Sequence, residues 1–192
     1  MAYCMQCGHA ADRVIPAGDT RPRLVCPACG YIHYDNPKVI NGCILVHDDK
    51  VLLCRRAIEP RRGFWTLPAG FMELGETMRD GGNRECMEEA EAQGENLQLY
   101  CLYDIPSIGQ IHVMFLGTLK NGQFGVGEES LECALFAEQD IPWDDLAFQN
   151  VIETLRFYFA DRQAGATLGK FPLHQKTIER NRDAPDSASG NP

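Results

Sequence analysis

Three glutamates lie close together in the stretch Gly70–Ala92 and could bind a divalent cation. Glu88 and Glu89 follow Glu85 by three and four residues, so on a helix the three carboxylates share one face. Mg²⁺ prefers oxygen ligands and retains water or phosphate oxygens in its remaining positions. It lowers the pKa of bound water and neutralises charge on a phosphate under attack. Taken alone, the glutamates would fit a solvated acidic helix face better than a metal site.

The residues around these glutamates extend the pattern. Gly70 is followed after five residues by Glu76, and after seven more by Arg84, which directly precedes the three glutamates. This spacing closely resembles the Nudix box, the motif of the Nudix hydrolase family. The resemblance implies that the three glutamates bind Mg²⁺ or Mn²⁺ or act as the base. It also implies that Arg84 and Glu76 form a supporting catalytic pair, in which the guanidinium holds the carboxylate.

The motif departs from the family pattern at Glu91, where the family has a glycine near the end of the catalytic helix. Gly94 can supply a left-handed cap instead, so we predict a longer helix over residues 77–93. Gly81 and Gly82 are also unexpected, because each glycine inside a helix costs about 1 kcal/mol relative to alanine. The sequence offers no firm explanation for this pair.

Two matched cysteine pairs predict a structural zinc site near the N-terminus. Cys4 and Cys7 form one pair, Cys26 and Cys29 form the other, and eighteen residues lie between them. Two such turns can complete a tetrahedral zinc site. About 35 residues bury too little apolar surface to fold alone, so a metal staple is reasonable. A redox role is the weaker alternative, because it needs only one pair. The remaining five cysteines are predicted to be core residues.

The zinc ribbon, an Asn–Pro link, the lead-in Trp65–Gly70 and Ile141–Trp143 together resemble one Nudix subgroup. Its members carry an N-terminal ribbon and are often described as ADP-ribose or FAD pyrophosphatases. The resemblance implies an α/β fold, a Nudix-type α/β/α sandwich with a mixed sheet preceded by the small ribbon. It further implies a homodimer in which water attacks phosphorus of a nucleoside diphosphate linked to another group, releasing AMP.

Two alternative functions remain open. NADH pyrophosphatases also carry a ribbon, but they have a Ser-Gln-Pro-Trp-Pro-Phe-Pro-like element after the box. Here that region reads Leu-Tyr-Asp-Ile-Pro-Ser-Ile-Gly-Gln over residues 102–110. A non-catalytic nucleotide- or nucleic-acid-binding protein is the second alternative. The intact glutamates argue against it, and the ribbon carries three basic and three acidic residues rather than a basic patch.

Further site residues are expected outside the box. The family often uses a glutamate from a later loop or strand, for which Glu132 is the first candidate, with Glu128 and Glu129 as alternatives. The arginines that precede the box could contact the substrate's phosphates, since arginine binds phosphate through parallel hydrogen bonds. A solvated basic loop is the alternative. The predicted substrate-binding arginines are Arg55, Arg56 and Arg62.

Apolar periodicity and turn residues predict the elements that position this chemistry. A second helix is expected to begin at Asp144 or Asp145 and to carry Leu146 through Phe159. Strands are predicted over 39–46, 51–54, 64–68, 97–105, 111–119 and 130–136. The expected domains are a zinc ribbon at 1–35, a Nudix domain with a C-terminal extension at 36–179, and a disordered tail at 180–192.

Composition narrows the function classes. The 192 residues include 27 acidic and 18 basic side chains, a net charge of -9, which makes nucleic acid an unlikely general partner. No apolar run approaches the roughly 20 residues that span a bilayer, so no membrane partner is expected. The nine cysteines are not arranged as a secreted disulfide framework, which favours a cytoplasmic location. The resemblance to the Nudix family implies that the protein acts on a small nucleotide.

Overall fold

The computed structural model describes residues 2–179, so the tail predicted at 180–192 lies outside the described residues. The chain divides into two compact units, Met1–Pro37 and Lys38–Pro192. The predicted boundary, after residue 35, falls two residues earlier. Within the described residues of the first unit, Cys4 and Cys26 are the two buried side chains. The first unit therefore has almost no apolar core of its own.

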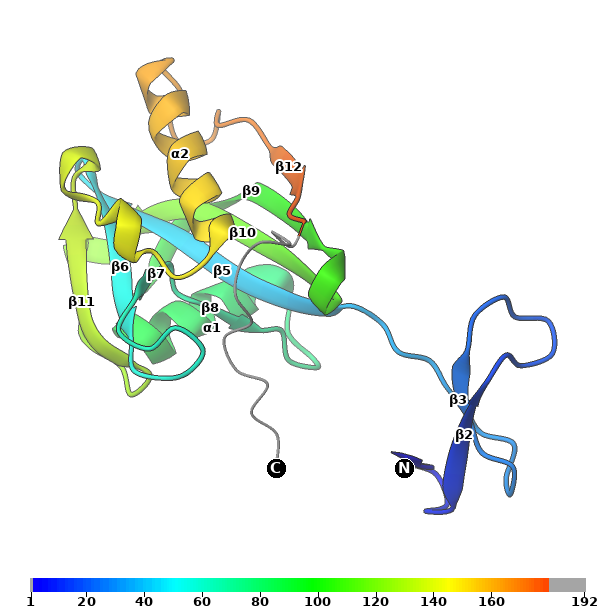
Figure 1. Cartoon of the computed structure of the whole chain (residues 1–192). Helices are drawn as coiled ribbons and strands as arrows, with labels where there is room; N and C mark the ends of the chain where they lie inside the picture. Colours follow the sequence, from blue (N-terminus) through cyan, green and yellow to red (C-terminus); the bar gives the residue numbers. More distant parts are fainter. Residues whose placement is uncertain (1, 180–192) are drawn as a thin grey trace. The chain divides into compact units, whose positions relative to one another are not determined.

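The first unit is an antiparallel four-stranded sheet with the order β1-β2-β3-β4. Figure 1 labels its two longer strands, and the cysteine pairs lie in the turns beside them. A unit of this size with almost no apolar core needs an additional staple, such as a metal ion, to be stable. Its strands are β1 (Ala2–Tyr3), β2 (Ala10–Val14), β3 (Arg23–Val25) and β4 (Ile32–His33).

The second unit is built on a mixed sheet with the order β11-β6-β5-β10-β9-β12, to which β7 adds beside β6 and β8 beside β5. The β5–β10 and β9–β12 pairs are parallel, and the other pairs are antiparallel. Its strands are β5 (Lys38–His47), β6 (Lys50–Arg56), β7 (Trp65–Thr66), β8 (Ala69–Phe71), β9 (Gly94–Ile105), β10 (Gln110–Leu119), β11 (Ser130–Phe136) and β12 (His174–Thr177).

Two helices, α1 (Met78–Ala90) and α2 (Gln149–Gln163), cover opposite faces of this sheet (Figure 1). Alternate side chains of β5 point to opposite faces, as the pleat of a strand requires. Cys43 and Leu45 pack in the cluster that contains the apolar side of α1. Ile44 and Val46 pack in the cluster that contains α2. The predicted α/β/α sandwich with a mixed sheet is confirmed.

Several boundaries differ from the prediction. The strand expected over 64–68 is only the two-residue β7, and β8, which was not predicted, follows it at Ala69–Phe71. The first helix begins as expected, with the Thr77 side chain accepting from the backbone N–H of Asp80, but it ends at Ala90. Glu91 itself takes the left-handed conformation, with φ of 47°, so the longer helix capped by Gly94 was wrong. The second helix begins at Gln149 rather than at residue 144 or 145.

Short 3₁₀ turns connect the longer elements: Pro106–Ile108, Lys120–Gly122, Glu138–Asp140 and Trp143–Asp145. The last of these stands where the second helix was expected to begin. β12 was not predicted, because its sequence His-Gln-Lys-Thr shows no apolar alternation. Across residues 2–179, the helices are too short or too polar for any of them to cross a lipid bilayer.

Candidate active site and metal sites

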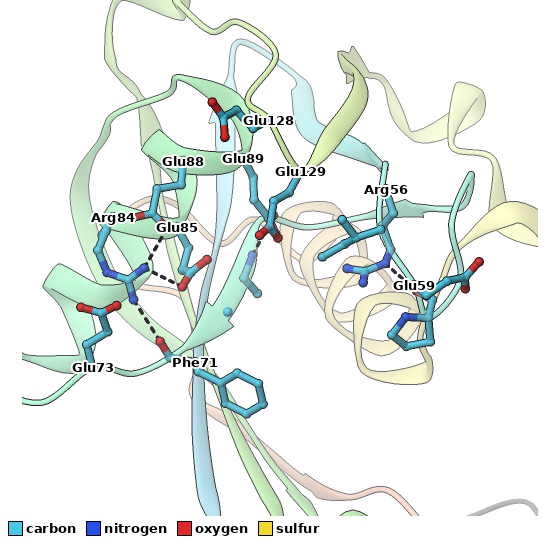
Figure 2. Close-up of a pocket in the computed structure, with 14 residues that line it drawn as sticks. Arg56, Glu59, Phe71, Glu73, Arg84, Glu85, Glu88, Glu89, Glu128 and Glu129 are labelled. Carbon is cyan, nitrogen blue, oxygen red and sulfur yellow. Dashed lines mark hydrogen bonds and ion pairs between the residues drawn. The ribbon is translucent and has the colours of Figure 1, made fainter. Parts of the chain in front are cut away.

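A cavity of about 770 Å³ lies in the second unit beside α1 and β8. It is strongly acidic, because seven glutamates and only two arginines, Arg56 and Arg84, line it (Figure 2). Ile58, Pro60 and Phe71 give it an apolar side. The acidic lining residues are Glu59, Glu73, Glu85, Glu88, Glu89, Glu128 and Glu129.

The first glycine of the box makes room for a carboxylate. Gly70 lies in β8, and a Cβ built on it would collide with the carboxylate of Glu85. Glu85 can therefore reach over β8 only because residue 70 has no side chain. The helix that carries Glu85 is fixed at its start by the Thr77 cap. The spacing between Gly70 and Glu85 thus has a steric reason.

Arg84 organises the carboxylates around it. Its Nε and Nη2 donate to the two carboxylate oxygens of Glu76, both at 3.1 Å. Its Nη1 donates to Glu85 at 2.8 Å and to Glu88 at 2.9 Å, and its Nη2 also reaches the carbonyl of Phe71 at 3.0 Å. These hydrogen bonds raise the pKa of Arg84 and lower the pKa of Glu76. One guanidinium therefore orients three acidic side chains.

Glu89 is the most buried carboxylate of the cavity, at 6% exposure. Its Oε2 accepts a hydrogen bond from the backbone N–H of Ala69 at 3.2 Å. Within residues 2–179 no cationic side chain forms an ion pair with it. Burial raises the pKa of Glu89 to about 8, and burial also raises the pKa of Glu85. Oxygen donors of this kind on one helix face fit a hard divalent cation.

A loop after β10 brings two further glutamates to the cavity. The N–H of Gly125 donates to the carbonyl of Ala90 at 2.7 Å, and that of Gly127 to the carbonyl of Glu89 at 3.1 Å. A Cβ on Gly127 would collide with the helix backbone. The two glycines thus allow the loop to dock on the end of α1. Figure 2 shows that Glu129 then points to the same region as Glu89.

Glu132, the first candidate for the downstream glutamate, is placed elsewhere. It lies on β11, does not line the cavity, and its Oε2 is 3.7 Å from Nη1 of Arg55. A register shift in the β11–β6 pair lies between Ser130 and Glu132, so the regular alternation of the strand is interrupted there. The structure brings the alternatives, Glu128 and Glu129, to the cavity instead.

Only one of the three candidate arginines lines the cavity. Arg56 lines the cavity, where its Nε donates to the carbonyl of Pro60 at 2.8 Å and its guanidinium lies 5.1 Å from the centre of the Phe148 ring. Arg55 donates to the carbonyl of Gly63 and faces β11. Arg62 is exposed and outside the cavity lining. Only Arg56 of the three lies where it could meet a bound phosphate.

The four cysteines of the first unit converge on one point. Their sulfur atoms all lie within 4.8 Å of one another, with 3.7 Å between Cys4 and Cys29 and 3.5 Å between Cys7 and Cys26. A backbone hydrogen bond from Cys29 is the main reason that the pKa of Cys26 falls to about 6. Four sulfurs in this arrangement fit a tetrahedral metal ion.

Comparison with known families identifies both units of the chain. Residues 37–155 match the model of the NUDIX domain, and residues 2–35 match the model of the N-terminal ribbon, described as Nudix N-terminal. The chain belongs to the Nudix family. The resemblance carried by the box and by the cysteine pairs is thereby confirmed.

Several proteins resemble this Nudix chain. A crystal structure of a NUDIX hydrolase from Nitrosomonas europaea is 48% identical, with a TM-score of 0.88, covering 94% of this chain and all of that one. NAD-capped RNA hydrolases NudC from Enterobacter sp. and Escherichia coli are 30% identical over 144 residues, which is 73% of this chain. The chain spans 53% of the length of these curated relatives.

More distant structures share the fold alone. A bifunctional NMN adenylyltransferase/ADP ribose pyrophosphatase from Francisella tularensis, complexed with AMP and a manganese ion, is 16% identical with a TM-score of 0.59. It covers 67% of this chain, and the matched region is 42% of that protein. Such a likeness shows that the Nudix fold is common to both proteins.

Proposed function

We propose that this Nudix protein is a divalent-metal-dependent pyrophosphohydrolase that cleaves a nucleoside diphosphate linked to another group. The observation that carries the proposal is the convergence of Glu85, Glu88 and Glu89 on one side of a large cavity. Arg56 lines the same cavity without a carboxylate partner among the described residues. A cluster of metal-binding oxygens near a guanidinium that is not neutralised by a carboxylate suits a substrate that carries a pyrophosphate.

Glu85, Glu88 and Glu89 would hold Mg²⁺ or Mn²⁺. When bound, the ion supplies an activated water and stabilises charge on the phosphate under attack. Arg84 fixes oxygens of Glu85 and Glu88 at 2.8 and 2.9 Å, so they are ordered before any ion arrives. The N–H of Ala69 does the same for Glu89. The chain therefore provides a preorganised set of ligands.

The remaining cavity residues would orient the substrate and the attacking water. Arg56 would grip the phosphate on the side away from α1, with its own position fixed by the carbonyl of Pro60. Glu129 points toward Glu89 and is a candidate to accept the proton of the attacking water (Figure 2). Phe71 and Ile58 would contact the less polar parts of the substrate.

Among substrates, a nicotinamide dinucleotide is the first choice. The curated relatives are named as NAD-capped RNA hydrolases, which favours the NADH pyrophosphatase alternative over ADP-ribose or FAD. The chain spans about half of those relatives and has a different segment at residues 102–110. ADP-ribose and FAD therefore stay in the substrate panel. NAD-capped RNA is included as well, and we expect it to react more slowly because the ribbon has no excess of basic residues.

The test is incubation of the full chain with NADH, ADP-ribose, FAD and NAD-capped RNA, with Mg²⁺ or Mn²⁺, followed by separation of the products. We expect cleavage at the pyrophosphate with release of a nucleoside monophosphate, and loss of the reaction in EDTA. No cleavage of any pyrophosphate substrate with either metal would refute the proposal.

For the first unit we propose a structural Zn²⁺ held by Cys4, Cys7, Cys26 and Cys29. The convergence of the four sulfurs and the near absence of an apolar core both support it.

The homodimer and the cytoplasmic location expected from the sequence stay predictions.

A further inference from the structure

Asn41 is a buried polar residue without a visible role. It stands in the middle of β5 and is 0% exposed. Among residues 2–179, its Oδ1 and Nδ2 are the buried side-chain polar atoms that lack a hydrogen-bond partner. An unpaired buried amide destabilises a protein, and an apolar residue of similar size would avoid that loss. Its presence therefore calls for an explanation beyond folding.

The position of Asn41 places it directly beneath the carboxylate network. Asn41 and Cys43 are two residues apart on β5, so their side chains point to the same face of the sheet, and Cys43 packs toward α1. A Cβ built on Gly81 of α1 would lie 2.7 Å from Nδ2 of Asn41 and 2.6 Å from Oε1 of Glu76. Both polar atoms thus surround one point, in the space that the missing side chain of Gly81 leaves open.

The same packing accounts for the two glycines inside α1. Gly81 makes room for Asn41 and Glu76, while a Cβ on Gly82 would lie 3.1 Å from the sulfur of Cys43. Two consecutive glycines on the helix therefore meet two successive inward side chains of β5. Gly82 serves close helix–sheet packing, whereas Gly81 brings a polar amide near a polar carboxylate. Glycine at position 81 destabilises the helix relative to alanine. Its presence is explained if the close approach of the Asn41 amide to the Glu76 carboxylate contributes to function.

We propose that Asn41 is a positioning residue for the metal-binding carboxylates and acts through Glu76 and Arg84. Its amide and Oε1 of Glu76 both lie within 3 Å of the position that a Gly81 Cβ would occupy, so the amide dipole acts on the carboxylate at close range although no direct hydrogen bond joins the two side chains. Glu76 accepts two hydrogen bonds from Arg84, and Arg84 in turn holds Glu85. Asn41 thereby keeps Glu76 in the geometry that Arg84 needs. This inference rests on the proposed metal-dependent function.

The principal test is Asn41→Leu in the full chain, which keeps the number and branching of the side-chain heavy atoms and removes the amide. We expect its melting temperature to equal or exceed that of the wild type. We expect its dissociation constant for Mn²⁺, measured by calorimetry, and its Mg²⁺ concentration for half-maximal hydrolysis to rise roughly tenfold. At saturating metal, kcat should change by less than about threefold, because the metal ligands themselves are intact.

Matched variants separate positioning from packing. Asn41→Ala and Asn41→Ser create nearly equal cavities, but only serine can donate a hydrogen bond. We expect serine to recover at least half of the metal affinity that alanine loses. Cys43→Ala, two residues away on the same face, should lower the melting temperature and leave Mn²⁺ binding within about twofold of the wild type.

Wild-type Mn²⁺ affinity in Asn41→Leu would overturn the proposal, as would equal affinities of the alanine and serine variants. If the leucine variant does not fold, the alanine and serine pair decides the question. If the wild type hydrolyses none of the substrates, the proposed function fails. The calorimetric comparison would still show whether Asn41 positions metal-binding carboxylates, so the two failures are distinguishable.

Discussion

Replacing Glu91 with glycine is expected to stabilise the protein. Glu91 ends α1 with φ of 47° and ψ of 33°, and a residue with a Cβ is destabilised in this region by about 1–2 kcal/mol. Glycine removes that penalty but loses about 0.5–1 kcal/mol through its greater freedom in the unfolded chain. The expected net gain in the free energy of unfolding is about 1 kcal/mol, which raises the melting temperature by about 2–4 °C in a domain of this size.

Two control variants isolate the backbone effect. A carboxylate at the C-terminal end of a helix is unfavourable to the helix dipole, so part of any gain could come from losing charge. Glu91→Gln removes the charge and keeps the side chain. Glu91→Ala removes the carboxylate and keeps the Cβ, and thus keeps the left-handed penalty. Neither control should gain as much as the glycine variant.

Urea unfolding followed by tryptophan fluorescence is a suitable assay, because Trp65 and Trp143 both lie in the second unit. The midpoint should rise in Glu91→Gly with an unchanged slope, which indicates a change of stability alone. A midpoint for Glu91→Gly at or below that of Glu91→Ala would refute the argument that backbone strain at this position destabilises the protein.

Three further predictions concern the metal sites and the core. Cys26→Ser should lower bound zinc well below one ion per chain and destabilise the first unit, as measured by metal analysis and proteolysis; one zinc per chain after the change would contradict the four-cysteine site. Arg84→Lys cannot reproduce the paired hydrogen bonds to Glu76, so metal affinity should fall by about 10–100-fold in calorimetry, and wild-type affinity would disprove the organising role. Burial lowers the pKa of His112 to about 4, below its unfolded value of about 6.5, so its contribution to stability is complete above pH 6.5 and is lost as pH falls toward 4. His112→Gln should therefore show a shallower decline of stability in that window, by up to about 1 kcal/mol per pH unit, and equal slopes would exclude this effect.

Much of the site was predictable from spacing. The helix start at Thr77 and the common face of Glu85, Glu88 and Glu89 depend on local rules of capping and periodicity. The convergence of the four cysteines depends on two short turns of the same kind. Such features involve residues close in sequence, so the amino-acid sequence alone contains most of the information needed to predict them.

Features that depend on tertiary packing were not predictable. The sequence does not reveal that Glu91 adopts the left-handed conformation, because glutamate is rare there; the N–H groups of Glu91 and Ala92 donate to the carbonyls of Met87 and Cys86 and close the helix. The loop with Gly125 and Gly127 docks on that end of the helix. The same docking brings Glu129 to the cavity, while an irregularity in β11 leaves Glu132 beside Arg55. The available signal for the docked loop was the pair Gly125 and Gly127, which are separated by one residue and directly precede the acidic pair Glu128–Glu129.

The strand β12 was missed because long-range polar contacts hold it. Nε2 of His174 lies 2.8 Å from Asp161, and Nζ of Lys176 lies 2.7 Å from Glu153, so a hydrogen bond and an ion pair fix the strand against α2. Its partner in the sheet is β9, more than seventy residues earlier in the chain. Patterns of apolar residues carry no information about such a pairing.

The measurement that tests the central proposal most directly is hydrolysis by Glu89→Gln. This change removes one ligand charge without changing the volume, and glutamine resembles the neutral form that burial favours, so the melting temperature should not fall. With NADH and Mg²⁺, we expect the release of nucleoside monophosphate to fall by at least about a hundredfold, equivalent to several kcal/mol of lost metal stabilisation. Wild-type rates in a correctly folded Glu89→Gln protein would contradict the assignment of this helix face as the catalytic metal site.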